Sequence, residues 1–436
     1  MNICVTVNSK YKRYLYIMLE SLYENNQQSE IRLFVIQRDF TDDDKNEISS
    51  LTKRYGNTVE FIWVDEHKYD DMPIYRIGRS NLSLEIYFRL LIPEYLPDEI
   101  DRVLMLDVDI VINKDISDLY NIDLEDYYFA AAPNMCHNFL VREEWREWYS
   151  KDRINWIHYN TGILMWNLKK IRKDFPREYI FKLAWEIPIK TATFEEEIFN
   201  VAFGDKGIKN IPAEKWNYIS THENWFKNPR FHRYKDVEEI KRNCGIIHYA
   251  AMNPWQAGVK NESFRLWWDW TAKSPYYEEI LRECYEQSER YLIEMQKKIE
   301  DQEKKLVYVD MLLDDAYRQR LIKRLCDKKI KRIEIYGAGR VARCIDNALQ
   351  QTGIEILCYI DRLYRGIFCG RKTIDFEAIR TYETDADAII VSTPYYIEEI
   401  KKDIRPYTRL DILNLDDLLA DEEIDYAKEL ISGLEK

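Results

Sequence analysis

The stretch that most limits how this chain can fold is residues 103–111, where two aspartates interrupt an apolar run, Val-Leu-Met-Leu-Asp-Val-Asp-Ile-Val. A short continuous apolar run is typical of a strand buried on both faces of a parallel sheet. Because side chains alternate along an extended chain, Asp107 and Asp109 are expected to point the same way. Two such carboxylates repel each other unless a divalent cation, which can also bind phosphate oxygens, lies beside them. The alternative is a solvated Asp-x-Asp turn.

Strand-like and helix-like segments alternate through the first 120 residues. The predicted strands are 3–7, 31–36, 59–64 and 103–106, and the predicted helices are 11–24, 42–55 and 83–91, the last of which stops near Pro93. This alternation predicts an α/β fold with a parallel sheet covered by helices on both faces. In such sheets ligands bind beyond the carboxyl ends of the strands, which is where Asp107 and Asp109 fall.

Polar side chains recur in otherwise apolar surroundings. Asn8 follows the first predicted strand, where its amide suits the edge of a uracil ring, although asparagine is also common in ordinary turns. Arg89 lies in an apolar helical face and needs an anionic partner, either a structural carboxylate or a substrate phosphate. Asn160 and Gly162 are predicted to form a tight polar turn before a buried strand. His248 ends a strand-like run, where a hydrogen-bonded core histidine is the commoner alternative to a metal ligand.

Three adjacent acidic residues, Glu195–Glu197, open an apolar helical segment, Ile198–Phe203. Acidic residues in a first helical turn favour the helix dipole, so capping is the simplest interpretation. Three carboxylates exceed what capping needs. Since they point in different directions on a helix, one or two of them can face a single site.

Net charge and cysteine usage exclude several classes of protein. The formal net charge is −13, so no general attraction to nucleic acid or anionic lipid is expected. The eight cysteines are scattered without a Cys-x-x-Cys pair, which favours reduced thiols in the cytoplasm over disulfides or a zinc site. Residues 1–8 are predicted to form a strand rather than a signal peptide, and no apolar run is long enough for a transmembrane helix.

Several motifs occur in one order between residues 1 and 275. They are Asn8, Tyr87-x-Arg89-Leu90, Leu106-Asp107-Val108-Asp109, Asn160-Thr161-Gly162 before Asn167-Leu168, Glu195–Glu197 before Asn200, Trp216-Asn217, and His248-Tyr249 before Pro254-Trp255. Together they resemble glycosyltransferase family 8, the retaining enzymes that include lipopolysaccharide galactosyl- and glucosyltransferases and glycogenin. The resemblance implies a GT-A fold, a hexosyltransferase activity, UDP-glucose or UDP-galactose as donor, and Mn²⁺ as cofactor, with Mg²⁺ as the other option.

The resemblance also implies roles for the matched residues. Asp107, Asp109 and His248 would hold the metal, and a mixed carboxylate and imidazole shell is compatible with manganese. Asn8 would contact the uracil ring, and Arg89 would reach the sugar or the diphosphate.

The sugar end of the donor site includes one departure from the family's pattern. Asn160 would touch the donor sugar, and Val108 would also contact the donor. Glu195 and Glu196 stand where many members have Asp-Gln, at the reacting face of the sugar, and are the candidate catalytic residues. This departure leaves the identity of the sugar open. A carboxylate at Glu196 could in principle be a nucleophile.

A second departure concerns the diphosphate. The family's loop usually carries a lysine that binds it, whereas residues 251–255 have none and place Asn253 in that donor-binding loop. Arg89 and the metal, or another cation such as Lys260, would then neutralise most of the leaving group. The implied reaction is a retaining transfer in which the metal stabilises departing UDP through an oxocarbenium-like transition state.

The implied acceptor is a glycan or lipid-linked precursor, as in lipopolysaccharide or capsule synthesis, and the implied location is the cytoplasm or the inner face of the membrane. Two other functions remain open. A nucleotidyltransferase would want a Gly-rich basic N-terminal loop, and residues 8–12 contain no glycine. A non-catalytic, nucleotide-sugar-binding scaffold is favoured by the missing loop lysine and by the segments that follow residue 275.

Residues 276–327 form a predicted helical connector without glycine or proline between a domain at 1–275 and a domain at 328–436. Apolar residues recur at sevens, at Tyr285, Leu292, Ile299, Leu306 and Leu313. Such a repeat predicts a homodimer that forms through residues 276–325. The alternative is a long helix, or two helices, packed on the chain's own domains.

Residues 328–436 begin a second βαβ pattern. The predicted strands 333–336 and 354–360 flank Gly337-Ala338-Gly339 and a helix that runs to Leu349, and Asp361 ends the second strand. This is a Gly-x-Gly-x-x-Ala fingerprint in the required strand-turn-helix context. It predicts a small Rossmann-like domain with Gly337, Gly339 and Asp361 as cofactor-binding residues. A structural or assembly role is the alternative.

Overall fold

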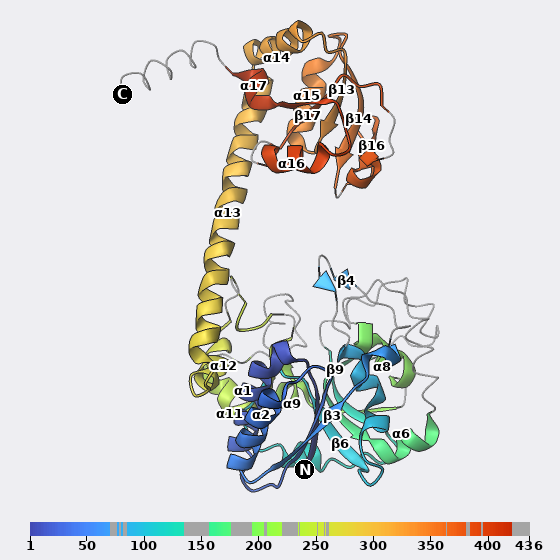
Figure 1. Cartoon of the computed structure of the whole chain (residues 1–436), viewed down its shortest axis with the longest axis vertical. Helices are drawn as coiled ribbons and strands as arrows, with labels where there is room; N and C mark the ends of the chain where they lie inside the picture. Colours follow the sequence, from blue (N-terminus) through green and yellow to red (C-terminus); the bar gives the residue numbers. More distant parts are fainter. Residues whose placement is uncertain are drawn as a thin grey trace, which may run out of the picture. The chain divides into compact units, whose positions relative to one another are not determined.

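The computed structural model describes residues 1–69, 76–77, 80–81, 85–134, 157–175, 194–204, 207–219, 234, 236–250, 252–256, 258, 261–362, 364–380, 384–393 and 396–420 (Figure 1). The chain divides into two compact units, Met1–Ser288 and Glu289–Lys436. Each contains a sheet with helices, so the predicted α/β class is confirmed. The domain limits at residues 275 and 327 stay predictions.

The first unit is built on a seven-stranded sheet in the order β10-β8-β9-β6-β1-β2-β3. Its strands are β1 (Asn2–Thr6), β2 (Arg32–Gln37), β3 (Thr58–Trp63), β6 (Arg102–Leu106), β8 (Phe129–Pro133), β9 (Tyr159–Asn167) and β10 (Ile208–Asn210). The run β6-β1-β2-β3 is parallel, as predicted. Strand β9, whose direction the sequence analysis did not predict, runs antiparallel to both β6 and β8. The sequence of a strand that is apolar on both faces does not show whether the strand runs parallel or antiparallel to its neighbours.

Both faces of the central strands of this sheet are buried, whereas the edge strand β3 is partly exposed. Helices α1 (Lys12–Glu24) and α2 (Asp42–Arg54) cover one face, where Leu15 and Leu51 pack with Val5 of β1. Helices α6 (Leu168–Asp174) and α8 (Phe194–Phe203) supply apolar side chains to the core on the opposite face. This two-sided burial explains why the central strands are apolar without alternation.

The helix predicted over 83–91 is instead divided into short pieces. These are α3 (Glu85–Phe88), the 3₁₀ turn η3 (Arg89–Leu91) and α4 (Ile92–Tyr95). Pro93 does not end a helix but occupies the first turn of α4. Proline is tolerated there because the N–H it lacks has no helical partner at that position.

A second, three-stranded sheet was not predicted from the sequence. It joins β11 (Tyr218–Ile219), β12 (Ile246–His248) and β7 (Ile110–Ile112) in that order. Strand β12 runs antiparallel to β7 and sets His248 opposite Ile110. The Tyr249 N–H also donates to the Asp109 carbonyl at 2.9 Å. This register brings the end of β12 to the Asp-x-Asp segment between β6 and β7.

The remaining elements of the first unit are short. They are η1 (Ser9–Tyr11), η2 (Glu66–Tyr69), β4 (Arg76–Ile77), β5 (Ser80–Asn81), α5 (Ser117–Tyr120), α9 (Ala213–Trp216), α11 (Val237–Asn243) and α12 (Phe264–Thr271).

The predicted connector contains two helices, α13 (Tyr277–Leu313) and α14 (Asp315–Asp327) (Figure 1). Asp314 separates them and caps α14, since its side chain accepts a hydrogen bond from the Ala316 N–H at 2.8 Å. Among the described residues, no helix combines the length and the apolar composition needed to cross a membrane.

The second unit contains a six-stranded sheet in the order β15-β16-β14-β13-β17-β18, parallel except for β15. Its elements are β13 (Arg332–Tyr336), α15 (Arg340–Leu349), β14 (Glu355–Asp361), β15 (Gly366–Phe368), β16 (Arg371–Asp375), η6 (Phe376–Arg380), β17 (Ala388–Val391), α16 (Ile397–Ile404), β18 (Asp411–Asn414) and α17 (Leu415–Leu419). The last turns of α13 belong to this unit's core through Tyr308, Val309 and Leu312.

Candidate active site

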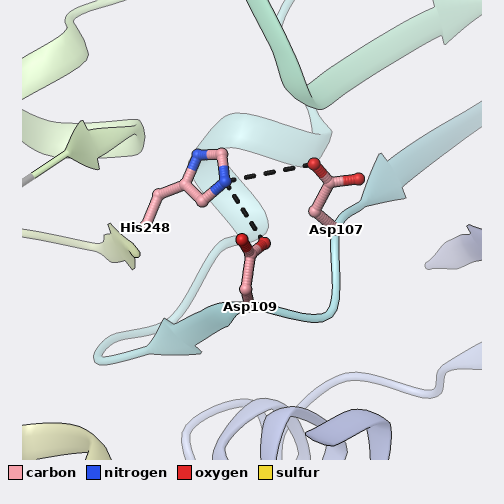
Figure 2. Close-up of side chains that lie close together, drawn as sticks. All are labelled: Asp107, Asp109 and His248. Atoms are coloured by element: carbon pink, nitrogen blue, oxygen red, sulfur yellow. Dashed lines mark ion pairs between the residues drawn. The ribbon is translucent and has the colours of Figure 1, made fainter. Parts of the chain in front are cut away.

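Asp107, Asp109 and His248 meet where β6, β7 and β12 come together (Figure 2). The Nε2 atom of His248 lies 3.3 Å from Oδ1 of Asp109 and 3.9 Å from Oδ2 of Asp107. One potential ligand atom from each of the three residues lies within 4.8 Å of the others. Two carboxylates and an imidazole at this spacing can share a single divalent cation.

Gly162 leaves the space beside this cluster open. A Cβ atom at position 162 would lie 2.4 Å from Cε1 of His248 and 2.8 Å from Oδ2 of Asp107. The prediction of a polar turn at Asn160 and Gly162 is wrong, because both residues lie within β9. Glycine is needed at this position because His248 and Asp107 lie close to the backbone, not because the chain reverses there. Both the donor atoms and the available room therefore fit a bound metal ion.

The charges of the cluster are interdependent. Burial is the largest influence on the pKa of Asp107 and raises it, although Arg89 opposes the shift. Burial would also raise the pKa of Asp109, but the neighbouring His248 outweighs it and lowers this pKa overall. The pKa of His248 is raised, because the two aspartates outweigh the opposing effect of burial. A metal ion would take over the role of this imidazole proton as the positive partner of the aspartates.

A chain of buried hydrogen bonds orients the His248 ring. Its Nδ1 atom lies 2.9 Å from Oδ1 of Asn217, and Nδ2 of Asn217 donates to Oδ1 of Asn160 at 2.7 Å. Nδ2 of Asn160 then donates to Oε2 of Glu196 at 2.8 Å. Because an ionised carboxylate only accepts, this order makes Nδ1 of His248 the donor. In its neutral form, the form that binds a metal, the ring would then present the Nε2 lone pair to the space beside the aspartates.

Glu196 is buried, with 5% of its surface exposed, so its role is not limited to capping α8. Its Oε1 atom accepts from Nδ2 of Asn134 at 2.6 Å and lies 3.4 Å from Nδ1 of His158. The Thr161 N–H approaches Oε2 at 3.3 Å. These contacts fix the Glu196 carboxylate beside β9. The backbone of Glu195 lies in α8, and its side chain lies outside the described residues.

Arg89 and Asn253 border the cluster. Nη2 of Arg89 lies 2.9 Å from Oδ1 of Asp107, and the arginine is buried. Nδ2 of Asn253 donates to Oδ2 of Asp109 at 3.4 Å and to the Tyr249 carbonyl at 3.2 Å. The anion expected beside Arg89 is therefore a carboxylate of the candidate metal site. Lys260 lies outside the described residues.

Asn8 has a separate set of polar neighbours. Its Nδ2 atom donates to Oε2 of Glu85 at 3.3 Å, and Nε of Arg38 donates to Oε1 of the same glutamate at 2.6 Å. Val108 packs beside two of the hydrophobic cores. The contacts of Glu85, like those of Asn134 and His158, join segments far apart in the sequence, and no local pattern pointed to them.

Two of the three predicted cofactor-binding residues of the second unit, Gly337 and Asp361, contact other residues of the same unit. Gly337 has φ +98°, and a Cβ atom there would lie 2.5 Å from Oγ of Ser392, so only glycine fits. Oδ2 of Asp361 accepts from the Ala338 N–H at 2.8 Å, and its Oδ1 accepts from the Tyr364 N–H at 3.0 Å. Gly339 precedes α15 with open space around it. Cofactor binding by these residues stays a prediction.

Comparison with protein families matches residues 2–258 to the description Glycosyl transferase family 8. The chain belongs to glycosyl transferase family 8. This membership confirms the predicted hexosyltransferase class of enzyme. Residues 329–409 separately match the description C2185-like, N-terminal.

A relative by sequence and two solved structures are similar to this chain. General stress protein A of Bacillus subtilis (strain 168) is 26% identical over 274 residues, which are 60% of this chain and 89% of the relative. The structure of galactosyltransferase LgtC in complex with donor and acceptor sugar analogs has a TM-score of 0.53 at 19% identity, and the match covers 63% of this chain and 96% of LgtC. The WbbM bifunctional glycosyltransferase has a TM-score of 0.50 at 18% identity, with coverages of 65% and 51%. These likenesses confirm the predicted GT-A fold.

Proposed function

We propose that this family 8 enzyme transfers glucose or galactose from its UDP-sugar to a glycan or lipid-linked acceptor, with retention, and that it depends on a divalent metal ion. The observation that carries the proposal is the cluster of Asp107, Asp109 and His248, whose ligand atoms lie within 4.8 Å of one another. LgtC, which shares the fold, was solved with donor and acceptor sugar analogs. A nucleotide-sugar donor is therefore the substrate class to test first.

The cofactor that best suits these metal ligands, two carboxylates and an imidazole, is Mn²⁺, since Mg²⁺ prefers oxygen ligands and retains more of its waters. When bound, the ion would supply Lewis-acid stabilisation of the departing diphosphate. His248 presents Nε2 because Asn217 holds its Nδ1 atom at 2.9 Å. Arg89 adds positive charge beside Asp107. This charge matters because position 253, in the loop that would bind the diphosphate, holds a neutral asparagine and not a lysine.

The UDP-sugar would be bound by residues around the metal cluster. Asn8, which follows β1, would contact uracil, and Val108 would line the donor site. Asn160 would hold the sugar, with Glu196 and Glu195 at the reacting face. Glu196 is proposed as the carboxylate nearest the reacting carbon. Its hydrogen bonds to Asn134 and Asn160 keep its position fixed.

The acceptor and the cellular setting are proposed on the family alone. An acceptor in lipopolysaccharide or capsule synthesis, and a location in the cytoplasm or at the inner face of the membrane, would suit the family's bacterial members. A homodimer through residues 276–325 and cofactor binding by the second unit are separate proposals.

A donor panel tests the proposed function. UDP release should be measured from several UDP-hexoses with Mn²⁺, Mg²⁺ or EDTA, and products should be read by mass spectrometry. We expect UDP-glucose or UDP-galactose to be consumed with Mn²⁺ and not in EDTA. Binding of a UDP-sugar without turnover on any acceptor would favour the scaffold. Formation of UTP from UDP-sugar and pyrophosphate would favour the nucleotidyltransferase.

Arg89→Ala is expected to lower kcat/KM for the donor by about two orders of magnitude, the scale seen when one electrostatic stabiliser is removed. The reason is that Arg89 is the buried cation of the cluster and lies 2.9 Å from Asp107. Arg89→Lys, which keeps the charge, should retain more activity. Thermal unfolding of both variants must accompany the kinetics. Near-normal kcat/KM in Arg89→Ala, or a loss explained by unfolding, would remove Arg89 from the donor site.

A further inference from the structure

Helix α13 carries an exposed apolar stripe, which we define as Tyr285, Leu292, Ile299, Leu306 and Leu313. The exposed fractions of these side chains are 72%, 66%, 55%, 54% and 66%, respectively. Leaving five large apolar side chains in water on one helix is unfavourable, because removing apolar surface from water lowers the free energy. The stripe therefore indicates a surface that a partner covers.

The stripe differs from the face of α13 that packs within the second unit. That face is formed by Tyr308, Val309 and Leu312, which are 2%, 3% and 2% exposed. The stripe repeats every seven residues over four heptads, and this repeat keeps one seam of a helix facing a second helix. The partner that such a seam fits is another long helix with the same repeat.

The charges beside the stripe distinguish the two directions in which copies of α13 could pair. Taking the stripe as heptad position a, Lys298 and Lys305 occupy position g, and Glu303 and Asp310 occupy position e. In a parallel pair, position g of one helix faces position e of the next heptad on the other helix. Lys298 then faces Glu303, and Lys305 faces Asp310. An antiparallel pair would instead set lysines against lysines and acids against acids.

We propose that two copies of this chain associate through the α13 stripe as a parallel two-stranded coiled coil. The proposal goes beyond the proposed transfer reaction, whose site lies wholly in the first unit. Lys298 and Glu303 are both exposed and ready to pair between copies. Lys305 already pairs with Asp301 of its own helix at 2.5 Å, so it contributes less to the contact between copies.

The residues at heptad position d favour one alignment of the two helices but add little to the stability of the coiled coil. Position d holds Ser288, Met295, Gln302 and Val309. Val309 is buried in the second unit's own core, so the seam is most complete from residue 285 to residue 306. A polar side chain such as Gln302 at a seam position fixes register at a cost in stability.

Light scattering of the full chain at micromolar concentration tests the association. We expect the wild type to be a dimer and Leu292→Asp with Ile299→Asp to be a monomer with unchanged UDP-sugar turnover. The matched control is Ile367→Asp, which charges another exposed apolar residue, 71% exposed in β15, and should stay dimeric. A monomeric wild type, or a double variant that remains dimeric, would overturn the proposal, whatever the outcome of the donor assay.

Two further experiments, a cysteine cross-link and a charge swap, test the direction in which the helices pair. Leu292→Cys, in a Cys326→Ser background, should form a disulfide between copies on mild oxidation, whereas Arg290→Cys, on the other side of the helix, should not. Lys298→Glu should weaken dimerisation about tenfold, and Lys298→Glu with Glu303→Lys should restore it, since exposed pairs contribute a few tenths to 1 kcal/mol each. An absent Leu292→Cys cross-link, or no restoration by the charge swap, would exclude the parallel pair.

Discussion

Asp109→Asn is expected to reduce transfer by at least about a thousandfold while the protein stays folded, the scale of losing a main stabiliser of developing charge. The substitution is nearly isosteric but removes the charge that His248 faces at 3.3 Å. The site would then hold a metal ion with one carboxylate fewer. Asp107→Ala and Asp109→Ala should have the same effect. Asp109 is the cleaner test, because Asp107 also pairs with Arg89.

The assay for Asp109→Asn should measure Mn²⁺ binding by calorimetry beside donor turnover. Asp42→Asn is the matched control, since this carboxylate is 96% exposed at the start of α2 and should leave both quantities unchanged. Wild-type protein treated with EDTA should lose turnover and regain it with Mn²⁺. Full activity in the EDTA-treated protein, or in Asp109→Asn, would refute the metal assignment.

Gly162→Ala is expected to weaken Mn²⁺ binding by about 10- to 100-fold, the effect usual for residues that position metal ligands, and to lower kcat/KM at least as much. The added methyl group would lie 2.4 Å from His248 and 2.8 Å from Asp107, so a ligand must shift. Neither can move freely, because His248 is held by Asn217 and Asp107 by Arg89.

The control for Gly162→Ala is Ile163→Val in the same strand. Ile163 is buried in the core on the opposite face of the sheet, so this variant should cost about 0.5–1.5 kcal/mol of unfolding free energy without changing metal affinity. Added Mn²⁺ at high concentration should rescue part of the Gly162→Ala activity. Wild-type Mn²⁺ affinity in Gly162→Ala would show that the glycine is not required by the metal site.

The parts of the site that the sequence predicted are those set by local spacing. Asp107 and Asp109 lie two residues apart in the bend between β6 and β7, so they are close together because they are neighbours in the sequence. The position of His248 beside them depends on β12 pairing antiparallel to β7, a contact between segments more than a hundred residues apart. Only the order of family motifs suggested it. Asn134 and Glu85 carried no such signal.

The errors in predicting the fold came from residues that serve more than one structural purpose. Gly162 was interpreted as a turn residue, but its small size is needed beside His248. Pro93 was interpreted as a helix end, but proline is equally suited to a first turn. The direction of β9 could not be predicted, because its side chains are buried on both faces. In each case, tertiary contacts chose between locally equivalent options.

The hydrogen-bonded chain from His248 through Asn217 and Asn160 ends on Glu196, a residue proposed to face the sugar. Hydrogen bonds thus connect the residues that would select the sugar to a residue that would bind the metal. An engineer who replaces Glu196 to change sugar preference would also alter the restraint on the His248 ring. Selectivity and metal requirement should therefore vary together among natural or designed variants at this position.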